Sequence, residues 1–231
     1  MLKSTITDIF FDLDHTLWDF DTNSDAAFEQ LLQKHQLPFN LEEFLNVYEP
    51  INQQYWIDYA QQKRTKEEVK YGRLTDTFKQ LNYSLPKEKI KLLAQDYLDL
   101  LKQGTALIPG TIALLDYLKP KYHLHILTNG FAEVQADKLK NAGIDHYFDH
   151  LITSEETGKL KPHPIVFKQA LKKAGSLAHK SFMIGDNLKT DVLGARNAGM
   201  HAIHFDPADQ SDIDFKIIPK VRRLIEIKEI L

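Results

Sequence analysis

The chain alternates between short apolar runs and longer amphipathic segments. The apolar runs have strand length and predict β-strands at residues 6–12, 123–128, 147–153, 181–185 and 201–205. Helical periodicity before and between the last four runs predicts helices near residues 111–119, 132–142, 164–174 and 188–198. Alternation of strands and helices is typical of a parallel sheet with helices on both faces. The pattern therefore predicts an α/β fold.

A long insert separates the first predicted strand from the second. More than 100 residues lie between them, whereas a crossover between neighbouring parallel strands needs only about a dozen. The insert has the pattern of a small helical bundle. We therefore divide the chain into an α/β core, residues 1–17 and 106–231, and a helical domain, residues 18–105.

Four helical stretches are expected in the insert. Asn23 or Ser24 is expected to cap the first stretch, and Pro50 to kink or divide the second. Thr65 and Glu68 form a capping-box pattern at the start of the third. The apolar positions of the four stretches run from Phe28 to Leu32, Phe44 to Tyr59, Val69 to Phe78 and Ile90 to Leu101.

Composition restricts the chemistry that is available. Hydrophobic residues make up 43% of the chain and charged residues 26%, as in ordinary globular proteins. The absence of cysteine excludes disulfides, thiolate catalysis and cysteine-ligated metal sites, so any metal must bind oxygen or imidazole. No apolar run approaches the roughly 20 residues of a membrane helix, and the N-terminus does not resemble a secretion signal. We therefore expect a cytoplasmic protein with no membrane partner.

The charge pattern disfavours a nucleic-acid polymer as partner. The formal net charge is −3 at pH 7, and no broad basic surface is implied. The most basic run, residues 220–223, precedes apolar residues at helical spacing, and we expect it to be the solvated face of a terminal amphipathic helix. The expected partner is a small molecule, and either a monomer or a homodimer fits the sequence.

Asp12 and Asp14 follow the first apolar strand. Side chains two residues apart in an extended strand point the same way, so both carboxylates are expected to converge on one ligand. Two close carboxylates repel each other unless a cation lies between them or one is protonated, which indicates a hard divalent metal such as Mg²⁺. The alternative is that Asp14 or Thr16 caps the next helix.

Polar residues also follow the later strands, at the edge where parallel sheets place their reactive sites. Thr128 and the backbone amides after it can bind an anion where the next helix begins, although Asn129 followed by Gly130 is by itself typical of a turn. Lys161 precedes a proline that restricts the local backbone, so its ammonium can meet an oxyanion. Lys159 is a nearby competitor for this role.

Two further carboxylates follow the predicted strand at residues 181–185. Asp186 ends that strand, and Asp191 falls in the first turn of the next helix, so either could cap the helix. Asp186 is better placed to bind a metal. Asp191 could act directly or by orienting coordinated water.

Together these residues resemble the haloacid dehalogenase superfamily. The matching motifs occur in the family's order and read DLDHT at 12–16, TNG at 128–130, KP at 161–162 and GDNLKTD at 185–191. The resemblance spans nearly the whole chain. It implies a Rossmann-like parallel-sheet core with an inserted α-helical cap domain, and Mg²⁺ as the cofactor.

The resemblance also implies a role for each motif residue. Asp12 is the implied nucleophile, and Asp14 is the implied general acid and base. The implied phosphate-binding residues are Thr128, Asn129 and Lys161. The implied metal ligands are Asp12, the backbone carbonyl of Asp14, and Asp186, with Asn187 and Asp191 behind them. The expected reaction is hydrolysis of a phosphate monoester through an aspartyl-phosphate.

Particular sequence features distinguish phosphate monoester hydrolysis from the other reactions of this family. Family members that cleave carbon–halogen or phosphonate bonds lack the acid that corresponds to Asp14, and transporting members carry membrane helices. Phosphomutase activity stays open, because transfer to another hydroxyl shares the first half-reaction. A receiver-like signalling protein or a noncatalytic phosphate-binding protein is the alternative from a different class, although a lone receiver would not need a helical insert of about 85 residues.

The leaving group is indicated by weaker signals. The segments TLWDF at 16–20 and INQQYW at 51–56, followed by Arg73, are similar to a bacterial branch that includes pyrimidine 5′-nucleotidases. A nucleoside 5′-monophosphate is the implied substrate, with a sugar phosphate or another small-metabolite phosphate as the alternative. The candidate cap contacts are Asn52, Tyr55, Trp56 and Arg73, although periodic aromatics also pack inside helical bundles. Three histidines are expected to pack locally or face solvent: His15, His163 and His204.

Overall fold

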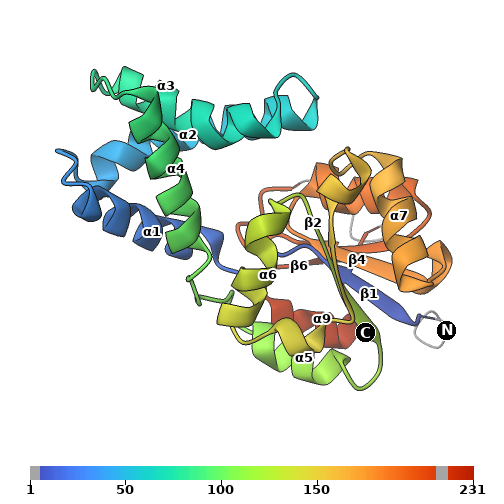
Figure 1. Cartoon of the computed structure of the whole chain (residues 1–231). Helices are drawn as coiled ribbons and strands as arrows, with labels where there is room; N and C mark the ends of the chain where they lie inside the picture. The colour runs from blue at the N-terminus through green and yellow to red at the C-terminus, as the bar shows by residue number, and fades with distance from the viewer. Residues whose placement is uncertain (1–5, 212–217) are drawn as a thin grey trace. The chain divides into compact units, whose positions relative to one another are not determined.

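The structure is a computed structural model that describes residues 6–211 and 218–231. The chain divides into two compact units (Figure 1). The first comprises the chain up to Phe20 together with Thr105–Leu231, and the second comprises Asp21–Gly104. All strands assigned in the described residues belong to the first unit, whereas the regular structure of the second is helical.

The first unit is built on a parallel six-stranded sheet, which confirms the predicted α/β fold. The strand order is β3-β2-β1-β4-β5-β6. Strand β1 is central, because its last residue, Phe11, pairs with Ile126 of β2 and Ile184 of β4. The residues that follow these three strands are therefore neighbours in space. The strands are β1 (Asp8–Phe11), β2 (His123–Thr128), β3 (His150–Thr153), β4 (Ser181–Gly185), β5 (His201–Phe205) and β6 (Lys220–Val221).

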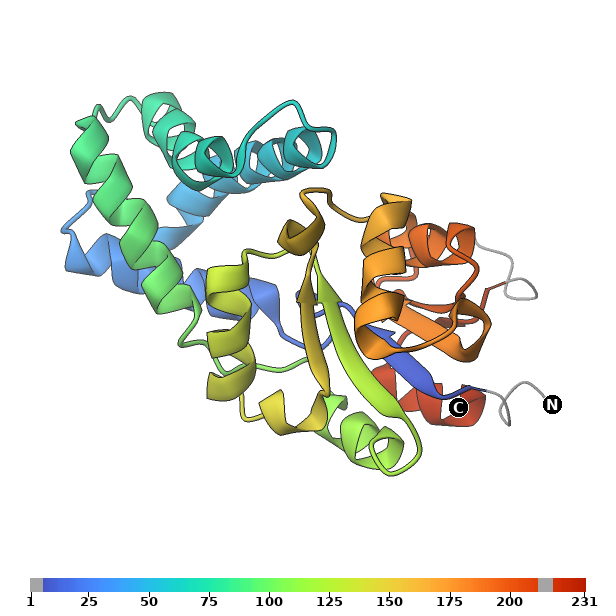
Figure 2. The ribbon, with the colours of Figure 1, turned by 45° about the vertical axis from the view of Figure 1, so that its right-hand side comes forward.

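Helices cover both faces of this sheet, as Figure 2 shows. On one face, Val166 and Phe167 of α7 and Ala195 of α8 are buried with Phe10 and Leu127 of the sheet. Helices α5, α6 and α9 lie on the other face. A π-helical turn, η5 (Leu188–Leu193), leads into α8. The helices of this unit are α5 (Thr111–Leu118), α6 (Ala132–Asn141), α7 (Pro164–Ala174), α8 (Gly194–Asn197) and α9 (Ile227–Ile230).

The C-terminal segment differs from the predicted amphipathic helix. Lys220 and Val221 form β6, an edge strand on β5, and only Ile227–Ile230 form an α-helix. The Lys220 ammonium lies 2.6 Å from Asp209 Oδ1 and donates to the Ser211 carbonyl over 2.8 Å. The expectation of a solvated helix face was wrong for Lys220, because pairing with β5 and with nearby acceptors outweighs the helical periodicity.

The helices of the second unit are α1 (Phe20–Lys34), α2 (Leu41–Ala60), η1 (Glu68–Gly72), α3 (Arg73–Gln80) and α4 (Lys87–Leu101). The first residue of α1, Phe20, still belongs to the first unit. Its core is aromatic. The Phe28 ring stacks on Tyr97 with centroids 4.1 Å apart and meets Tyr48 edge-on at 4.5 Å. Such ring pairs stabilise the packing beyond the apolar area that they bury.

Three expectations about helix boundaries in this unit have clear outcomes. The capping box of Thr65 and Glu68 is confirmed by reciprocal backbone bonds of 2.7 and 3.2 Å. Asn23 and Ser24 are not caps, since α1 begins at Phe20 and both are buried within it. Pro50 does not divide α2. Pro50 is exposed, so water can satisfy the carbonyl that its missing N–H leaves free.

None of the helices in residues 6–211 and 218–231 is both long enough and apolar enough to span a bilayer.

A buried polar network lies at the start of β1 and β2. His125 Nε2 donates to Asp8 Oδ1 over 2.9 Å, and Ser176 Oγ donates to Asp8 Oδ2 over 2.6 Å. His125 Nδ1 is buried without a hydrogen-bond partner. Burial lowers the pKa of His125 below its usual 6.5, and the opposing pull of Asp8 does not cancel this effect. His125 is therefore neutral in the folded protein at neutral pH.

This network predicts a loss of stability in mild acid. The unfolded chain binds a proton at His125 before the folded protein does, so the free energy of unfolding falls as the pH drops from about 7 to about 5, by at most about 1.4 kcal/mol per pH unit. His125→Gln keeps a donor for Asp8 and does not titrate, so its stability should depend less on pH in this range. Denaturant titrations with Mg²⁺ present measure the slopes, and the exposed His179→Gln is the control. Equal slopes in wild type and His125→Gln would contradict this account.

Candidate active site

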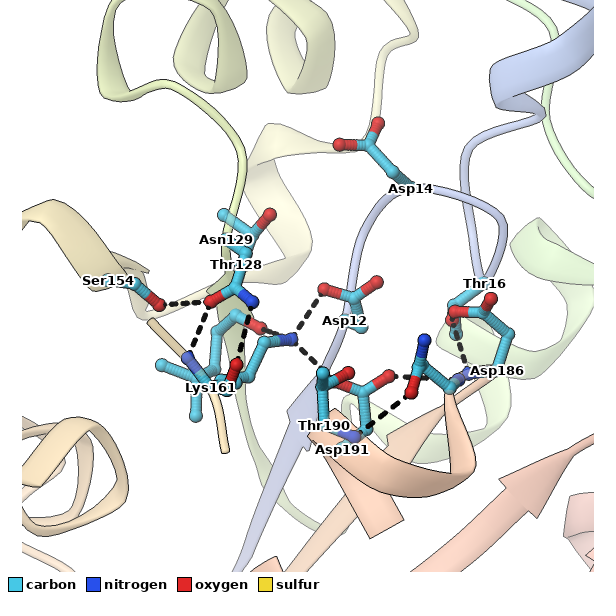
Figure 3. Close-up of polar contacts among 12 residues, drawn as sticks. Asp12, Asp14, Thr16, Thr128, Asn129, Ser154, Lys161, Asp186, Thr190 and Asp191 are labelled. Atoms are coloured by element: carbon cyan, nitrogen blue, oxygen red, sulfur yellow. Dashed lines mark hydrogen bonds and ion pairs between the residues drawn. The ribbon is translucent and has the colours of Figure 1, made fainter. Parts of the chain in front are cut away.

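The predicted site residues lie at the carboxyl edge of the sheet (Figure 3). Asp12 follows β1, Thr128 is the last residue of β2, and Asp186 follows β4. Because β1 pairs with both β2 and β4, these three positions meet at one place. Lys161 reaches the same place from the segment before α7.

Lys161 is the cation at the centre of the site. Its side chain is buried, and its ammonium lies 2.7 Å from Asp12 Oδ1 and 2.7 Å from Asp191 Oδ1. It also donates to the Leu127 carbonyl over 2.7 Å. Burial alone would lower the pKa of Lys161, but Asp12 and Asp191 raise it above its usual range. The ammonium therefore stays charged although it is removed from water.

Three carboxylates gather at this place, and two of them, Asp12 and Asp191, pair with the ammonium. Asp12, Asp186 and Asp191 each offer an oxygen, and these oxygens lie within 4.8 Å of one another. Burial and the neighbouring carboxylates raise the pKa of Asp12 to about 8, despite the opposing effect of Lys161. Burial and Asp191 likewise raise the pKa of Asp186 to about 7. One ammonium does not balance three carboxylates, and the carboxylates offer oxygen ligands, so these residues fit a hard divalent cation such as Mg²⁺.

Thr16 supports Asp186 rather than capping a helix. Its hydroxyl donates to Asp186 Oδ1 over 3.1 Å and accepts from the Asp186 amide over 3.0 Å.

The three histidines near the motifs lie in different surroundings. His204 is buried, and its Nε2 forms a hydrogen bond of 2.8 Å with the Asp186 carbonyl. His163 caps α7 through its ring nitrogen. Both histidines therefore pack locally, as expected, while His15 is exposed.

Asn187 caps the turn that follows β4. Its side-chain oxygen accepts from the amides of Lys189 and Thr190 over 3.1 and 3.0 Å. Neither Asp186 nor Asp191 makes this cap, contrary to the alternative raised by their positions. Asp191 instead accepts from the Asn187 amide over 3.1 Å and pairs with Lys161. The cap thus leaves both carboxylates available to the cluster.

Thr128 presents its hydroxyl hydrogen to the site. Its oxygen accepts from the Gly130 amide over 3.0 Å and from Gln135 Nε2 over 2.8 Å. Because these two bonds use both lone pairs of the oxygen, the hydroxyl can only donate to a further partner. A phosphate oxygen is such a partner.

Asn129 fixes the main chain of Lys161. Its side-chain oxygen accepts from the Lys161 amide over 2.8 Å and from Ser154 Oγ over 2.5 Å, and its Nδ2 donates to the Lys161 carbonyl over 3.2 Å. Gly130 does not adopt a positive φ, so a left-handed backbone is not the reason for glycine at this position. A Cβ at Gly130 would lie 2.1 Å from Gln135 Nε2, so glycine provides space there.

Asp14 does not share the cluster of the other acids. Its Oδ1 lies 2.7 Å from Lys138 Nζ, and its Oδ2 accepts from Gln135 Nε2 over 3.0 Å. Figure 3 shows its carboxylate apart from that of Asp12. The two carboxylates do not lie side by side as strand alternation would place them, because β1 ends at Phe11 and the alternation does not extend to Asp14. Burial alone would raise the pKa of Asp14, but Lys138 and the bond from Gln135 lower it below its usual range.

Gln135 and Lys138 were not predicted from the sequence. Both lie on α6, three residues apart, and both are buried. Their spacing places them on one helix face, which is the one signal that was available. A lysine and a glutamine in an amphipathic helix normally face solvent, so the pattern alone does not single them out.

The candidate cap residues belong to the second unit. Arg73 is buried, donates to Asn52 Oδ1 over 2.7 Å, and places its guanidinium 5.5 Å from the Tyr97 ring centroid. Trp56 is half-buried, with its ring 5.9 Å from that of Tyr59. Tyr55 packs inside the unit, and its hydroxyl donates to Asp76 over 2.6 Å.

Comparison with known proteins gives consistent matches. A family model described as haloacid dehalogenase-like hydrolase matches residues 9–205. Pyrimidine 5′-nucleotidase YjjG of Escherichia coli is 32% identical over 193 residues, which cover 83% of this chain and 82% of that protein. Glyceraldehyde 3-phosphate phosphatase of Methanothermobacter thermautotrophicus is 30% identical over an alignment of 240 residues, and this alignment covers 98% of this chain and 100% of that protein.

A solved structure shares the architecture. The magnesium-bound HAD-hydrolase YfnB of Bacillus subtilis, whose structure reveals interdomain movement, superposes with a TM-score of 0.88. The two chains are 29% identical, and the match covers 98% of each.

Proposed function

The chain belongs to the haloacid dehalogenase-like hydrolase family, and from its site we propose that it is a magnesium-dependent phosphatase that works through an aspartyl-phosphate on Asp12. One observation carries the proposal. Asp12 follows the central strand, β1, with one oxygen held 2.7 Å from Lys161 Nζ, in a cluster whose charge calls for a divalent cation. Such a carboxylate is oriented to attack phosphorus.

The first half-reaction transfers the phosphoryl group to the protein. An oxygen of Asp12 attacks phosphorus as the bond from phosphorus to the leaving oxygen breaks, and Asp14 gives its proton to that oxygen. Lys138 keeps Asp14 ionised before substrate binds. An arriving phosphate brings negative charge next to Asp14, which raises the pKa of this carboxyl and favours the protonated form.

The second half-reaction releases inorganic phosphate. Asp14, now ionised, takes a proton from water as the water oxygen attacks phosphorus, and the bond from phosphorus to Asp12 breaks. The Thr128 hydroxyl and the Lys161 ammonium hold the phosphoryl oxygens, while Asn129 holds the Lys161 backbone. Mg²⁺, when bound by Asp12, Asp186 and the Asp14 carbonyl, offsets the charge of the phosphoryl group.

We propose a nucleoside 5′-monophosphate as the substrate. The similarity to the Escherichia coli pyrimidine 5′-nucleotidase supports this choice, as does the TLWDF segment at residues 16–20. Asn52, Trp56 and Arg73 are our candidates for contacts with the nucleoside. A sugar phosphate is the second candidate, supported by the similarity to the glyceraldehyde 3-phosphate phosphatase.

A panel of phosphate monoesters tests both the magnesium-dependent phosphatase activity and the choice of a nucleoside 5′-monophosphate as substrate. With Mg²⁺ present, we expect kcat/KM for pyrimidine nucleoside 5′-monophosphates to exceed that for triose and hexose phosphates by about tenfold or more. Chelation of Mg²⁺ should reduce every rate by roughly 1,000-fold or more, because several kcal/mol of charge stabilisation is lost. Phosphate release and product identification are the readouts. Preference for sugar phosphates would overturn the nucleotidase assignment alone, and a sugar bisphosphate or a shifted phosphate among the products would indicate a mutase.

A further inference from the structure

Lys138 is a buried lysine whose contacts reach the proposed general acid. It lies on α6, is 2% exposed, and places its ammonium 2.7 Å from Asp14 Oδ1. The same ammonium lies 4.1 Å from the ring centroid of Trp18, a fully buried side chain. The carboxylate and the aromatic face restrict the ammonium to one place, because an ion removed from water keeps to its few favourable partners.

Gln135 holds the other oxygen of the same carboxylate. It is fully buried, and its Nε2 donates to Asp14 Oδ2 over 3.0 Å and to Thr128 Oγ1 over 2.8 Å. Asp14 and Thr128 are thereby joined through one amide group. The close approach needs a glycine at position 130, where a Cβ would lie 2.1 Å from Gln135 Nε2 and 3.2 Å from Asp14 Oδ2.

We propose that Lys138 and Gln135 are positioning residues that fix the Asp14 carboxylate in one orientation for proton transfer. Each oxygen of Asp14 has its own donor from the same face of α6, so the carboxylate cannot rotate without breaking a bond. Gln135 also sets the distance between Asp14 and the Thr128 hydroxyl. The inference rests on the proposed function, in which Asp14 protonates the leaving oxygen. Misplacement of a reacting group by about 1 Å can cost roughly 100-fold in rate.

The alternative is a purely structural ion pair, and the identity of the leaving group separates the two. An alkyl phosphate expels a poor leaving group that must be protonated, whereas an aryl phosphate such as p-nitrophenyl phosphate expels a stable phenolate. Loss of a structural contact lowers kcat/KM for both substrates equally. Loss of a correctly placed acid lowers it mainly for the alkyl ester. The ratio kcat/KM reports the steps up to departure of the leaving group and so leaves hydrolysis of the intermediate aside.

The experiment compares Lys138→Met with Lys138→Arg. Methionine keeps the apolar packing on Trp18 and removes the charge, whereas arginine keeps a cation. We expect Lys138→Met to lower kcat/KM for a nucleoside 5′-monophosphate by roughly 30-fold or more, and for p-nitrophenyl phosphate by about threefold or less. Lys138→Arg should recover part of the loss. Lys140→Met, an exposed position on the same helix, is the matched control and should change neither value.

Three further variants separate the possible outcomes. Asp14→Asn should show the same dependence on the leaving group, and adding Lys138→Met to it should cause little further loss. If Asp14→Asn lacks that dependence, the proposed role of Asp14 fails. If Asp14→Asn shows it and Lys138→Met lowers both substrates equally, only the positioning role of Lys138 is overturned. Gln135→Leu removes the other donor and gives an independent test should Lys138→Met fail to fold.

Discussion

Asp12→Asn is expected to lower turnover of every phosphate monoester by about 10,000-fold or more while leaving the fold intact. An amide oxygen is a poor nucleophile, so no covalent intermediate forms. Stability should move in the opposite direction. Burial raises the pKa of Asp12 to about 8, above its usual 3.8, so at neutral pH the metal-free chain must bind a proton at Asp12 when it folds, which lowers the free energy of unfolding. Asparagine needs no such proton, so Asp12→Asn should stabilise the metal-free protein at neutral pH.

Turnover and denaturant unfolding, each with and without Mg²⁺, measure these two effects. Asp12→Ala is measured as well, because slow deamidation of the introduced asparagine would restore the aspartate. Asp116→Asn is the matched control, because Asp116 belongs to the same unit, lies outside the site, and accepts a hydrogen bond from the Tyr147 hydroxyl. Phosphatase activity above about 1% of wild type in both Asp12 variants would show that another group is the nucleophile.

The parts of the site that the sequence predicts are those tied to strand ends. An apolar run with a polar residue after it marks both the strand and its reactive edge, which is why Asp12, Thr128 and Asp186 were found together. The same logic failed for Asp14, where it was extended beyond the end of β1. A pattern of period two holds only while the backbone is extended, and β1 ends at Phe11, shortly before a turn at residues 15–17 in which His15 adopts a positive φ.

The supporting residues were not predictable in the same way. Gln135 and Lys138 become buried because α6 packs over the end of β2 and places them beside Asp14, which is a consequence of tertiary structure. Lys220 shows the same effect, since its pairing with β5 is absent from the local pattern. Local periodicity describes which face of an element is apolar, and it cannot show which polar partner a distant segment will supply.

The two buried lysines divide the acids of the site between them. Lys161 pairs with Asp12 and Asp191 beside the proposed metal, whereas Lys138 pairs with Asp14 on the other side. The proposed nucleophile and the proposed general acid thus have separate counter-ions. This separation lets the pKa values of Asp12 and Asp14 move in opposite directions, as two carboxylates with different tasks require.

Lys161→Met is expected to lower turnover by roughly 1,000-fold or more and to destabilise the metal-free protein by about 3 kcal/mol at neutral pH. Methionine has a similar length but no charge, so Asp12 and Asp191 would lose their shared cation. The pKa of Asp12 would rise further, and more of this proposed nucleophile would be protonated. Because Asp12 is already protonated in the folded wild type below about pH 8, a further rise of its pKa adds to the loss of stability only above that pH, so the loss should grow between about pH 8 and pH 10.

Lys159→Met is the matched control, because Lys159 is the neighbouring lysine that the sequence left as a competitor for the same role. Turnover and unfolding are measured for both variants across this pH range. The double variant with Lys161→Met and Asp191→Asn removes one cation and one carboxylate from the cluster, so it should recover much of the lost stability but none of the lost turnover. If Lys159→Met abolishes turnover and Lys161→Met does not, the phosphate-binding cation has been assigned to the wrong residue, since the Lys161 contacts would then serve the fold alone.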